Sequence, residues 1–329
     1  MTQPLVLTCG EPAGIGPELA PLAWQALKDE LAFFWLGDPR HLPQDAPVVL
    51  IDTPAQAAAA MAQGLPVLAH DFGPPATPGR ANPAHAAHVI SVIEQAVGFV
   101  QTAQASALCT APIHKKALQD GAGFAFPGHT EFLAHLAGQR EVVMMLACAA
   151  LRVVPATIHI PLSAVAQALT PDLLRQTITI THAALIRDFG LKAPRIAVAG
   201  LNPHAGEGGA MGQEELRWIA PLLAQMRAQG IDILGPLPAD TMFHARARAG
   251  YDAAICMYHD QALIPIKTID FDHGVNVSLG LPFVRTSPDH GTAFDIAGRG
   301  QANPSSLIAA LRMAADMAKA RQGAPHNHP

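Results

Sequence analysis

The chain has 329 residues, of which 50% are hydrophobic and 14% are charged. A chain of this length is too long for one small core, so two domains or lobes are expected, and its composition can bury a sizeable core. The net charge of −5, without any run of Lys or Arg, argues against a nucleic-acid partner. The longest apolar run, 142–151, is about half the length of a membrane span, so no membrane association is predicted.

Cysteine usage indicates a reducing compartment. The cysteines lie far apart, each inside an apolar run: Cys9, Cys109, Cys148 and Cys256. This pattern is typical of buried, reduced thiols and lacks the CxxC spacing of zinc or redox sites. The N-terminus has neither a basic segment nor a long apolar core, so no signal peptide is expected. We therefore predict a soluble cytoplasmic protein.

The first part of the chain alternates short apolar runs with periodic helical segments. Strands are predicted at 5–9, 33–36, 48–51, 66–69 and 106–110, and helices at about 17–28 and 83–101. Asn82 is a plausible cap of the second helix, with Pro83 at its first position. The turn GEPAGIGPE (10–18) has the geometry of an anion site at a helix N-terminus, but fits neither GxGxxG nor a P-loop. Substrate contact and tight-turn scaffolding both remain open for it.

The second part continues the alternation. Strands are predicted at 142–147, 153–158, 195–200 and 253–257. Helices are predicted at about 171–189 with Thr170 as cap, at about 213–229, around His244, and from just after Asn303 to about Lys319. The pattern predicts an α/β fold with largely parallel sheets in two lobes.

The stretch from Tyr258 to Arg285 is the most informative one. It follows the apolar run 253–257, and ligands bind at the carboxyl ends of strands in open α/β sheets. Lys267, Asn276 and Arg285 come next, and these residue types suit a phosphate or carboxylate, since Lys offers a point charge and Arg a planar fork. Between Tyr258 and Lys267 we expect the chain to turn at a segment that contains a proline.

Three histidines share one context, just past apolar strands. His159, His204 and His259 each lie in a turn rich in Gly, Pro, Asn or Asp. If their strands lie side by side, three neutral imidazoles could hold a catalytic divalent metal that polarises a substrate oxygen. The alternative is three separate histidines that hydrogen-bond their own turns.

A further pair, His129 and Thr130, sits in the segment PGHTE, ahead of a predicted helix. The two side chains could donate to an anion. Alternatively the segment is a capping turn, with Thr130 as the N-cap and Glu131 in the first turn.

Seven segments resemble the 4-hydroxythreonine-4-phosphate dehydrogenase family of pyridoxal phosphate biosynthesis. They are GEPAGIGPE (10–18), PGHTE (127–131), IHIPL (158–162), GLNPHAGEGG (200–209), PLPADT (236–241), YHDQALIPIK (258–267) and VNVSLGLPFVRTSPDHGTAFDIAG (275–298). The similarity runs nearly end to end and is weakest at about 40–80. The segment HGTAFDIAGRGQANP also resembles isocitrate and isopropylmalate dehydrogenases. This implies their fold, with two lobes and an active-site cleft between them. The first lobe would comprise residues 1–130 plus 285–329 and include the NAD-binding segment. The second lobe would comprise residues 131–284 and carry the metal ligands and dimer contacts.

The resemblance also implies roles for individual residues. It places the metal ligands at His159, His204 and His259, and the substrate contacts at His129, Thr130, Lys267, Asn276 and Arg285. By analogy with the related dehydrogenases, it places His290, Asp295 and Asn303 near the adenosine half of NAD. It further implies a homodimer whose metal site lies between subunits, with one histidine, His259, supplied by the partner chain.

The implied reaction is the NAD- and metal-dependent oxidation of 4-phosphohydroxythreonine to a β-keto acid. That acid loses carbon dioxide to give 3-amino-2-oxopropyl phosphate. The metal would be Zn, Mg, Co or Mn, and the cofactor would be NAD or NADP. The candidates for the general base are Lys267 and Asp240. Two alternatives remain: a sister dehydrogenase of a phosphorylated four-carbon sugar acid (4-phosphothreonate or 4-phosphoerythronate), and an NAD-independent phosphate-transferring or metal-hydrolytic enzyme.

Overall fold

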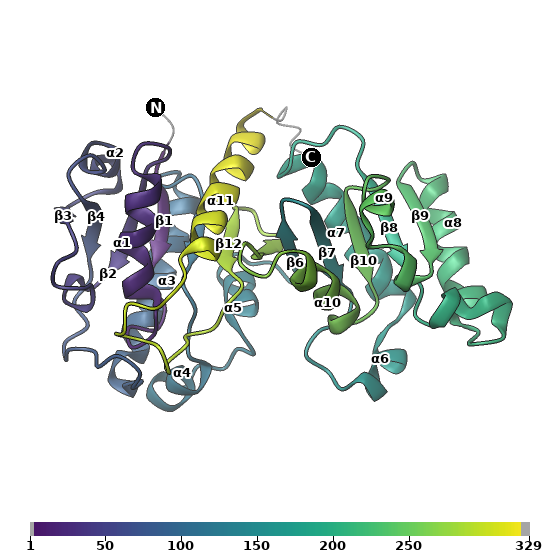
Figure 1. Cartoon of the computed structure of the whole chain (residues 1–329), viewed down its shortest axis with the longest axis horizontal. Helices are drawn as coiled ribbons and strands as arrows, with labels where there is room; N and C mark the ends of the chain where they lie inside the picture. Colours follow the sequence, from purple (N-terminus) through teal and green to yellow (C-terminus); the bar gives the residue numbers. More distant parts are fainter. Residues whose placement is uncertain (1–2, 324–329) are drawn as a thin grey trace. The chain divides into compact units, whose positions relative to one another are not determined.

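The computed structural model describes residues 3–323, which form two compact units (Figure 1). Within the described residues, unit 1 comprises residues 3–142 and 281–319, and unit 2 comprises residues 143–280 and 320–323. These bounds differ from the predicted ones, which lie after residues 130 and 284, and helix α5, His129–Leu136, spans the first predicted boundary.

The strands of unit 1 are all parallel to their neighbours, in the order β3-β4-β2-β1-β5-β12. Their bounds are β1 Leu5–Thr8, β2 Phe33–Gly37, β3 Val48–Ile51, β4 Leu65–Ala69, β5 Leu108–Thr110 and β12 Arg285–Pro288. Every residue of β1 and β2 is buried, as expected of parallel strands covered on both faces. This explains why they stand out in the sequence as continuous apolar runs.

Helices surround the strands of unit 1, and α1 and α3 pack on them. The longer helices are α1 Gly16–Leu27, α3 Ala86–Gln101, α4 Lys115–Ala122, α5 His129–Leu136 and α11 Ser305–Gly323, with short turns η1 Pro39–His41, η2 Pro54–Gln56, α2 Ala57–Ala60 and η3 Pro83–His85. The expected cap is confirmed, since the Asn82 side chain accepts a hydrogen bond from the Ala84 amide.

Unit 2 has the strand order β11-β6-β7-β10-β8-β9. Its strands are β6 Val143–Cys148, β7 Leu151–Pro155, β8 Arg195–Ala199, β9 Asp232–Leu237, β10 Ala253–Cys256 and β11 Val275–Leu279. The pairs β11–β6 and β6–β7 are antiparallel, and the remaining pairs are parallel. The predicted α/β fold with largely parallel sheets is therefore confirmed.

The helices of unit 2 include the segments that carry the candidate ligands. They are α6 Leu162–Ala168, α7 Pro171–Arg187, η4 Pro203–Gly209, η5 Glu215–Ile219, α8 Ala220–Ala228, η6 Ala239–Thr241, α9 Ala245–Arg248 and α10 His259–Ile269. Thr170 caps α7 as expected, because its side chain accepts a hydrogen bond from the Leu173 amide. Within residues 3–323, no helix is long and apolar enough to cross a membrane.

Candidate functional site

The three strands that precede the histidines are neighbours in unit 2. Strand β10 pairs in parallel with β7 on one side and with β8 on the other. His159 follows β7, His204 follows β8, and His259 begins α10 just after β10. The carboxyl ends of parallel strands meet at one edge of a sheet, so the turns that carry these histidines share an edge. Metal binding by them stays a prediction.

Two of the three imidazoles lie close together. The ring centroids of His159 and His259 are 5.7 Å apart. The Nδ1 atom of His259 lies 2.7 Å from the Asp260 carboxylate, an arrangement that fixes ring orientation in many metal-bound histidines. Within residues 3–323 of a single chain, however, no three His, Cys, Asp or Glu side chains are grouped so that they could hold a metal ion.

The backbone at two of these histidines is strained. His159 has a φ of 51° and His204 a φ of 52°, in the left-handed region that non-glycine residues rarely adopt. Such outliers cluster at ligand-binding and catalytic positions, where the surrounding structure holds them. The strain therefore supports a functional role for both turns.

A buried arginine marks the candidate anion site of unit 1. Arg285 opens β12 and is only 4% exposed, and its Nη2 and Nε atoms donate to the Thr110 hydroxyl at 2.7 and 3.2 Å. Burial lowers the pKa of Arg285 to about 10, so the guanidinium stays charged at neutral pH. A buried cation that donates to a neutral hydroxyl is well suited to receive an anionic ligand group.

His129 lies in the electrostatic range of that arginine. Burial, together with the charge of Arg285, lowers the pKa of His129 well below its usual value, so the ring is neutral. Its Nε2 atom is buried and has no hydrogen-bond partner in the described chain, which calls for an explanation such as a ligand. Helix α5 begins at His129 with Gly128 as its N-cap, so the alternative of Thr130 as cap is wrong. Both side chains thus belong to the first turn, where a helix attracts anions.

The other substrate-contact candidates, Lys267 and Asn276, lie in unit 2. Asn276 on β11 has a buried Oδ1 atom without a hydrogen-bond partner among the described residues. Lys267 lies in the last turn of α10, with its Nζ atom 5.6 Å from the centre of the Phe271 ring. The expected turn before Lys267 is wrong, because Pro265 lies inside the helix.

The segment implied to bind NAD, 290–303, is irregular backbone held by the β1–α1 loop. The Ile15 amide donates to the Thr292 carbonyl at 3.1 Å. The Glu18 carboxylate accepts from the amides of Gly298 and Gly300. Glu18 thus fixes the candidate cofactor segment from the first turn of α1, a role that sequence reasoning did not find. This contact favours the scaffolding role of the loop 10–18.

Within that segment the three predicted residues differ. The Nε2 atom of His290 is buried without a partner in the described chain, and burial lowers the pKa of its ring. Asp295 is exposed, and the Asn303 side chain accepts from the Ser305 amide at the start of α11. Asn303 therefore has a helix-capping role, and only His290 shows the unpaired polar atom expected of a ligand contact.

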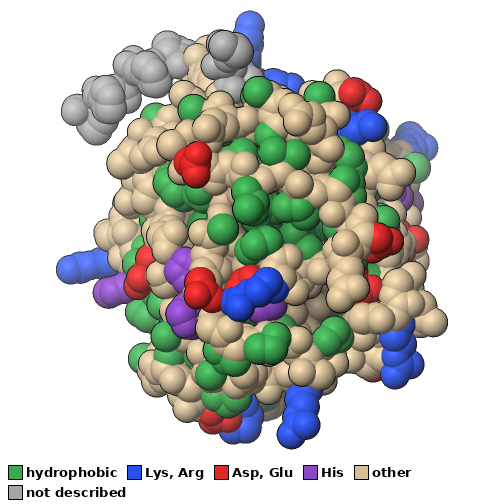
Figure 2. Space-filling model, turned by 90° about the vertical axis from the view of Figure 1, so that its left-hand side faces the viewer, with side chains coloured by type: hydrophobic (Ala, Val, Ile, Leu, Met, Phe, Trp, Pro, Cys, Tyr) green, Lys and Arg blue, Asp and Glu red, His purple; other side chains and the backbone are tan. Residues whose placement is uncertain are grey.

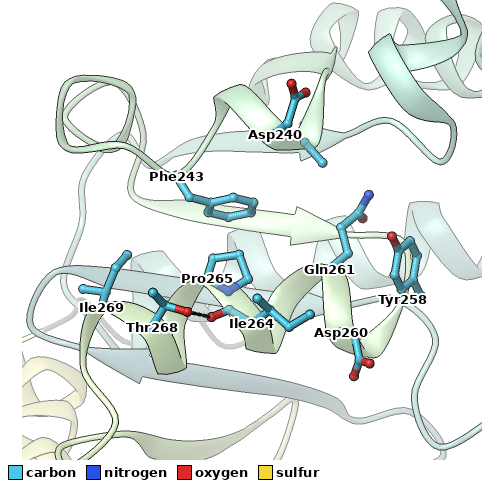
Figure 3. Close-up of a pocket in the computed structure, with 10 residues that line it drawn as sticks. Asp240, Phe243, Tyr258, Asp260, Gln261, Ile264, Pro265, Thr268 and Ile269 are labelled. Atoms are coloured by element: carbon cyan, nitrogen blue, oxygen red, sulfur yellow. Dashed lines mark hydrogen bonds between the residues drawn. The ribbon is translucent and has the colours of Figure 1, made fainter.

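A pocket of about 460 Å³ lies between η6 and α10 in unit 2. Asp240, Tyr258 and Gln261 line it together with apolar side chains, and Figure 3 shows Asp240 across the pocket from α10. Asp240 is exposed, and Lys267 is partly buried.

Unit 1 carries a histidine cluster that partly overlaps residues 40–80, where the motif resemblance is weakest. His41, His70, His85 and His88 surround Phe72, with ring centroids 5.1 to 5.8 Å from its centre. Both ring nitrogens of His41 are buried and lack hydrogen-bond partners in the described chain. On the side of the molecule where β3 and α2 lie, Figure 2 shows histidines beside acidic side chains and below an apolar area.

This cluster predicts acid sensitivity of the fold. Burial lowers the pKa of His41 to about 4 and also lowers that of His70. Because both folded pKa values lie below the ordinary value near 6.5, their stabilising contribution is complete above about pH 6.5 and is lost as pH falls towards 4. We expect Tm to fall between pH 7 and 5, and His41→Gln to reduce that fall by about 1–2 °C per kcal/mol recovered.

Thermal unfolding monitored by circular dichroism across this pH range checks the prediction. The matched control is His135→Gln at an exposed position, which should leave the slope of Tm against pH unchanged. Equal slopes for His41→Gln and the unsubstituted protein would contradict it.

Fold and site together define a class: a two-unit α/β protein with a buried Arg–His pair in one unit and histidine-bearing strand ends in the other. The family model described as pyridoxal phosphate biosynthetic protein PdxA matches residues 30–314. The chain belongs to this family, as the motifs predicted.

Relatives cover nearly the whole chain. A 4-hydroxythreonine-4-phosphate dehydrogenase of Roseobacter denitrificans is 65% identical over 318 residues, covering 96% of this chain and 98% of that protein. One of Paracoccus denitrificans is 61% identical over 324 residues, covering 97% and 99%. A crystal structure of the Klebsiella pneumoniae enzyme of that name superposes with a TM-score of 0.86 at 37% identity, covering 97% of this chain and 98% of that one.

Proposed function

We propose that this chain is a 4-hydroxythreonine-4-phosphate dehydrogenase. The observation that carries the proposal is the near-complete match to relatives of that name, at 65% identity over 96% of the chain. The reaction is oxidation of the substrate's secondary hydroxyl, with hydride transfer to NAD or NADP. The resulting β-keto acid loses carbon dioxide to give 3-amino-2-oxopropyl phosphate.

The candidate ligands of unit 2 are imidazoles, a donor type that suits a divalent cation. His159 and His259 bring two imidazoles together, and Asp260 orients the second one. With His204 they would supply three nitrogen ligands and leave a position for substrate, as in catalytic zinc sites. When bound, such a cation supplies a Lewis acid that lowers the pKa of a substrate hydroxyl. Zn, Mg, Co and Mn are all candidates, and the imidazole ligands favour Zn or Co over Mg.

The chain's own side chains would bind the substrate and orient it. Arg285 offers a charged fork, and the neutral His129 offers an unpaired ring nitrogen to the phosphate or carboxylate. Thr130, Lys267 and Asn276 complete the proposed substrate contacts, contributing orientation more than chemistry. Lys267 and Asp240 remain the candidates for taking the hydroxyl proton.

Cofactor binding is proposed for residues 290–303. The unpaired Nε2 atom of His290 supports a ligand contact there, and Glu18 holds the segment in place. Asp295 is accessible for a contact with the adenosine half of the cofactor, whereas Asn303 would act through the end of α11.

We propose a homodimer with a shared metal site because large apolar side chains of unit 2 are exposed next to the candidate metal ligands. Leu162 is 71% exposed just after His159, and Ile264 is 63% exposed on the helix that His259 begins. Large apolar side chains left in water beside candidate ligands are typical of a surface that a partner covers. The four cysteines are all free and buried, which supports a reducing cytoplasmic location.

The function is tested by following NADH formation at about 340 nm with 4-phosphohydroxythreonine, before and after chelation of the metal. We expect turnover that stops on chelation and returns with Zn²⁺ or Co²⁺, because the cation is proposed to lower the hydroxyl's pKa. Parallel assays use NADP and 4-phosphoerythronate. Faster turnover of the sugar acid would assign the chain to a sister activity, and turnover without NAD or NADP would overturn the proposal.

A further inference from the structure

One side-chain amide joins two of the turns that carry the histidines. The Gln261 Nε2 atom donates to the Gly200 carbonyl at 2.9 Å, at the end of β8 and shortly before His204. The Gln261 Oε1 atom accepts from the Met257 amide at 2.7 Å, at the end of β10 and shortly before His259. Gln261 thus connects these two strand ends through hydrogen bonds at both of its polar atoms.

The third histidine segment joins the same network through Met257. The Thr157 hydroxyl donates to the Met257 carbonyl at 2.7 Å, and the Thr157 amide donates to that carbonyl at 3.3 Å. Thr157 lies two positions before His159. A continuous series of hydrogen bonds therefore runs from the His159 segment through Met257 and Gln261 to the His204 segment.

The His204 turn has particular need of such anchors. Residues 204–208 all have positive φ, from 42° to 81°, and three of them are not glycine. A left-handed conformation costs such residues roughly 1–2 kcal/mol each, so contacts outside the turn must hold it. One contact is the buried Glu215, which accepts from the Asn202 amide at 2.8 Å and from its side chain at 2.9 Å. Gln261 supplies another, and it reaches the strand that leads to His259.

We propose that Gln261 is a positioning residue, which holds the His204 turn relative to the His159 segment of the same chain. The inference rests on the proposed metal centre and deepens it. The amide is suited to this role because it donates and accepts at once, whereas a carboxylate of the same shape can only accept. Gln261→Glu therefore keeps the hydrogen bond from the Met257 amide and loses the one to the Gly200 carbonyl. It also places a carboxylate oxygen next to the Gly200 carbonyl oxygen, and two acceptors repel each other.

The test compares Gln261→Glu with the unsubstituted protein by titration with Co²⁺, followed by its visible absorption, and by amide hydrogen exchange of the metal-free protein. We expect the Co²⁺ Kd to rise about 10- to 100-fold, the range for residues that orient metal ligands. Exchange at residues 201–212 should also quicken. The added negative charge alone would attract a cation, so weaker binding reports on position rather than charge.

Two further variants complete the design. Gln261→Met removes both hydrogen bonds without adding charge and should weaken binding at least as much. Gln225→Glu adds the same charge at an exposed residue of unit 2, whose Oε1 atom accepts from Arg175, and should change neither readout. If Gln261→Glu changes neither the Co²⁺ Kd nor the exchange rates, while His204→Ala abolishes Co²⁺ binding, the positioning role is wrong and the metal centre stands. Co²⁺ binding unaffected by His204→Ala would instead overturn the metal centre.

Discussion

Arg285→Ala is expected to raise KM for the phosphorylated substrate by about 10- to 100-fold. This is the scale of a lost charge-assisted fork, about 1.5–3 kcal/mol. The arginine is 4% exposed and already oriented by Thr110, so little conformational freedom is lost when it binds an anion. Initial rates at varied substrate concentration measure the effect, and kcat should change less than KM.

Because Arg285 is buried, its truncation could also disturb the fold, and a second variant separates the two effects. Arg285→Lys keeps the charge but not the planar fork, and should raise KM by an intermediate factor with little change in Tm. Arg140→Ala, at an exposed position of unit 1, is the control and should leave KM unchanged. If KM stays constant in a folded Arg285→Lys or Arg285→Ala protein, Arg285 does not contact the substrate.

Strands β1 to β5 of unit 1 could be predicted, because those buried on both faces leave a simple pattern, whereas β12, with the sequence RTSP, was not predicted. Parallel strands such as β2 contain only buried residues and therefore appear as unbroken apolar runs. Strand β9 was not predicted, since Gly235 and Pro236 within it indicate a turn. It lies at the end of the strand order of unit 2, where a proline interrupts fewer ladder bonds.

Helix α10 was missed for a similar reason, because a proline within it indicated a turn. Pro265 indicated a break, yet the helix continues through it to Ile269. Ala262, Leu263 and Ile266 are buried in the core of unit 2, and their packing outweighs the local preference of one proline.

Candidate ligands could be identified from residue type and motif, but their supports could not. His129 and Arg285 are far apart in sequence, and only the fold brings them into electrostatic contact. Glu18 and Gln261 act through hydrogen bonds to backbone groups of distant segments, and such contacts leave no spacing pattern. The left-handed turn of His204 has a partial signal in its glycines, although three of its strained residues are not glycine.

Mixing two inactive variants is expected to restore activity if the metal site is shared between subunits. His204→Ala and His259→Ala should each lose turnover and bound metal as homodimers, since each removes one of three proposed ligands. In a mixed dimer, one site carries both lesions and the other carries none. Co-expression with two affinity tags should therefore give heterodimers with up to about half of the unsubstituted activity, by the symmetry of a two-fold interface.

The pairing of variants also shows which histidine crosses the interface. If the partner supplies His259, as the resemblance implies, the mixture of His159→Ala with His259→Ala recovers activity and that of His159→Ala with His204→Ala does not. The close approach of the His159 and His259 rings within one chain, 5.7 Å between centroids, makes His204 the rival for that role. Recovery in the second mixture but not the first would transfer the role to His204. Verified heterodimers that stay inactive in every mixture would show that one chain supplies all three ligands, and the shared site would be wrong.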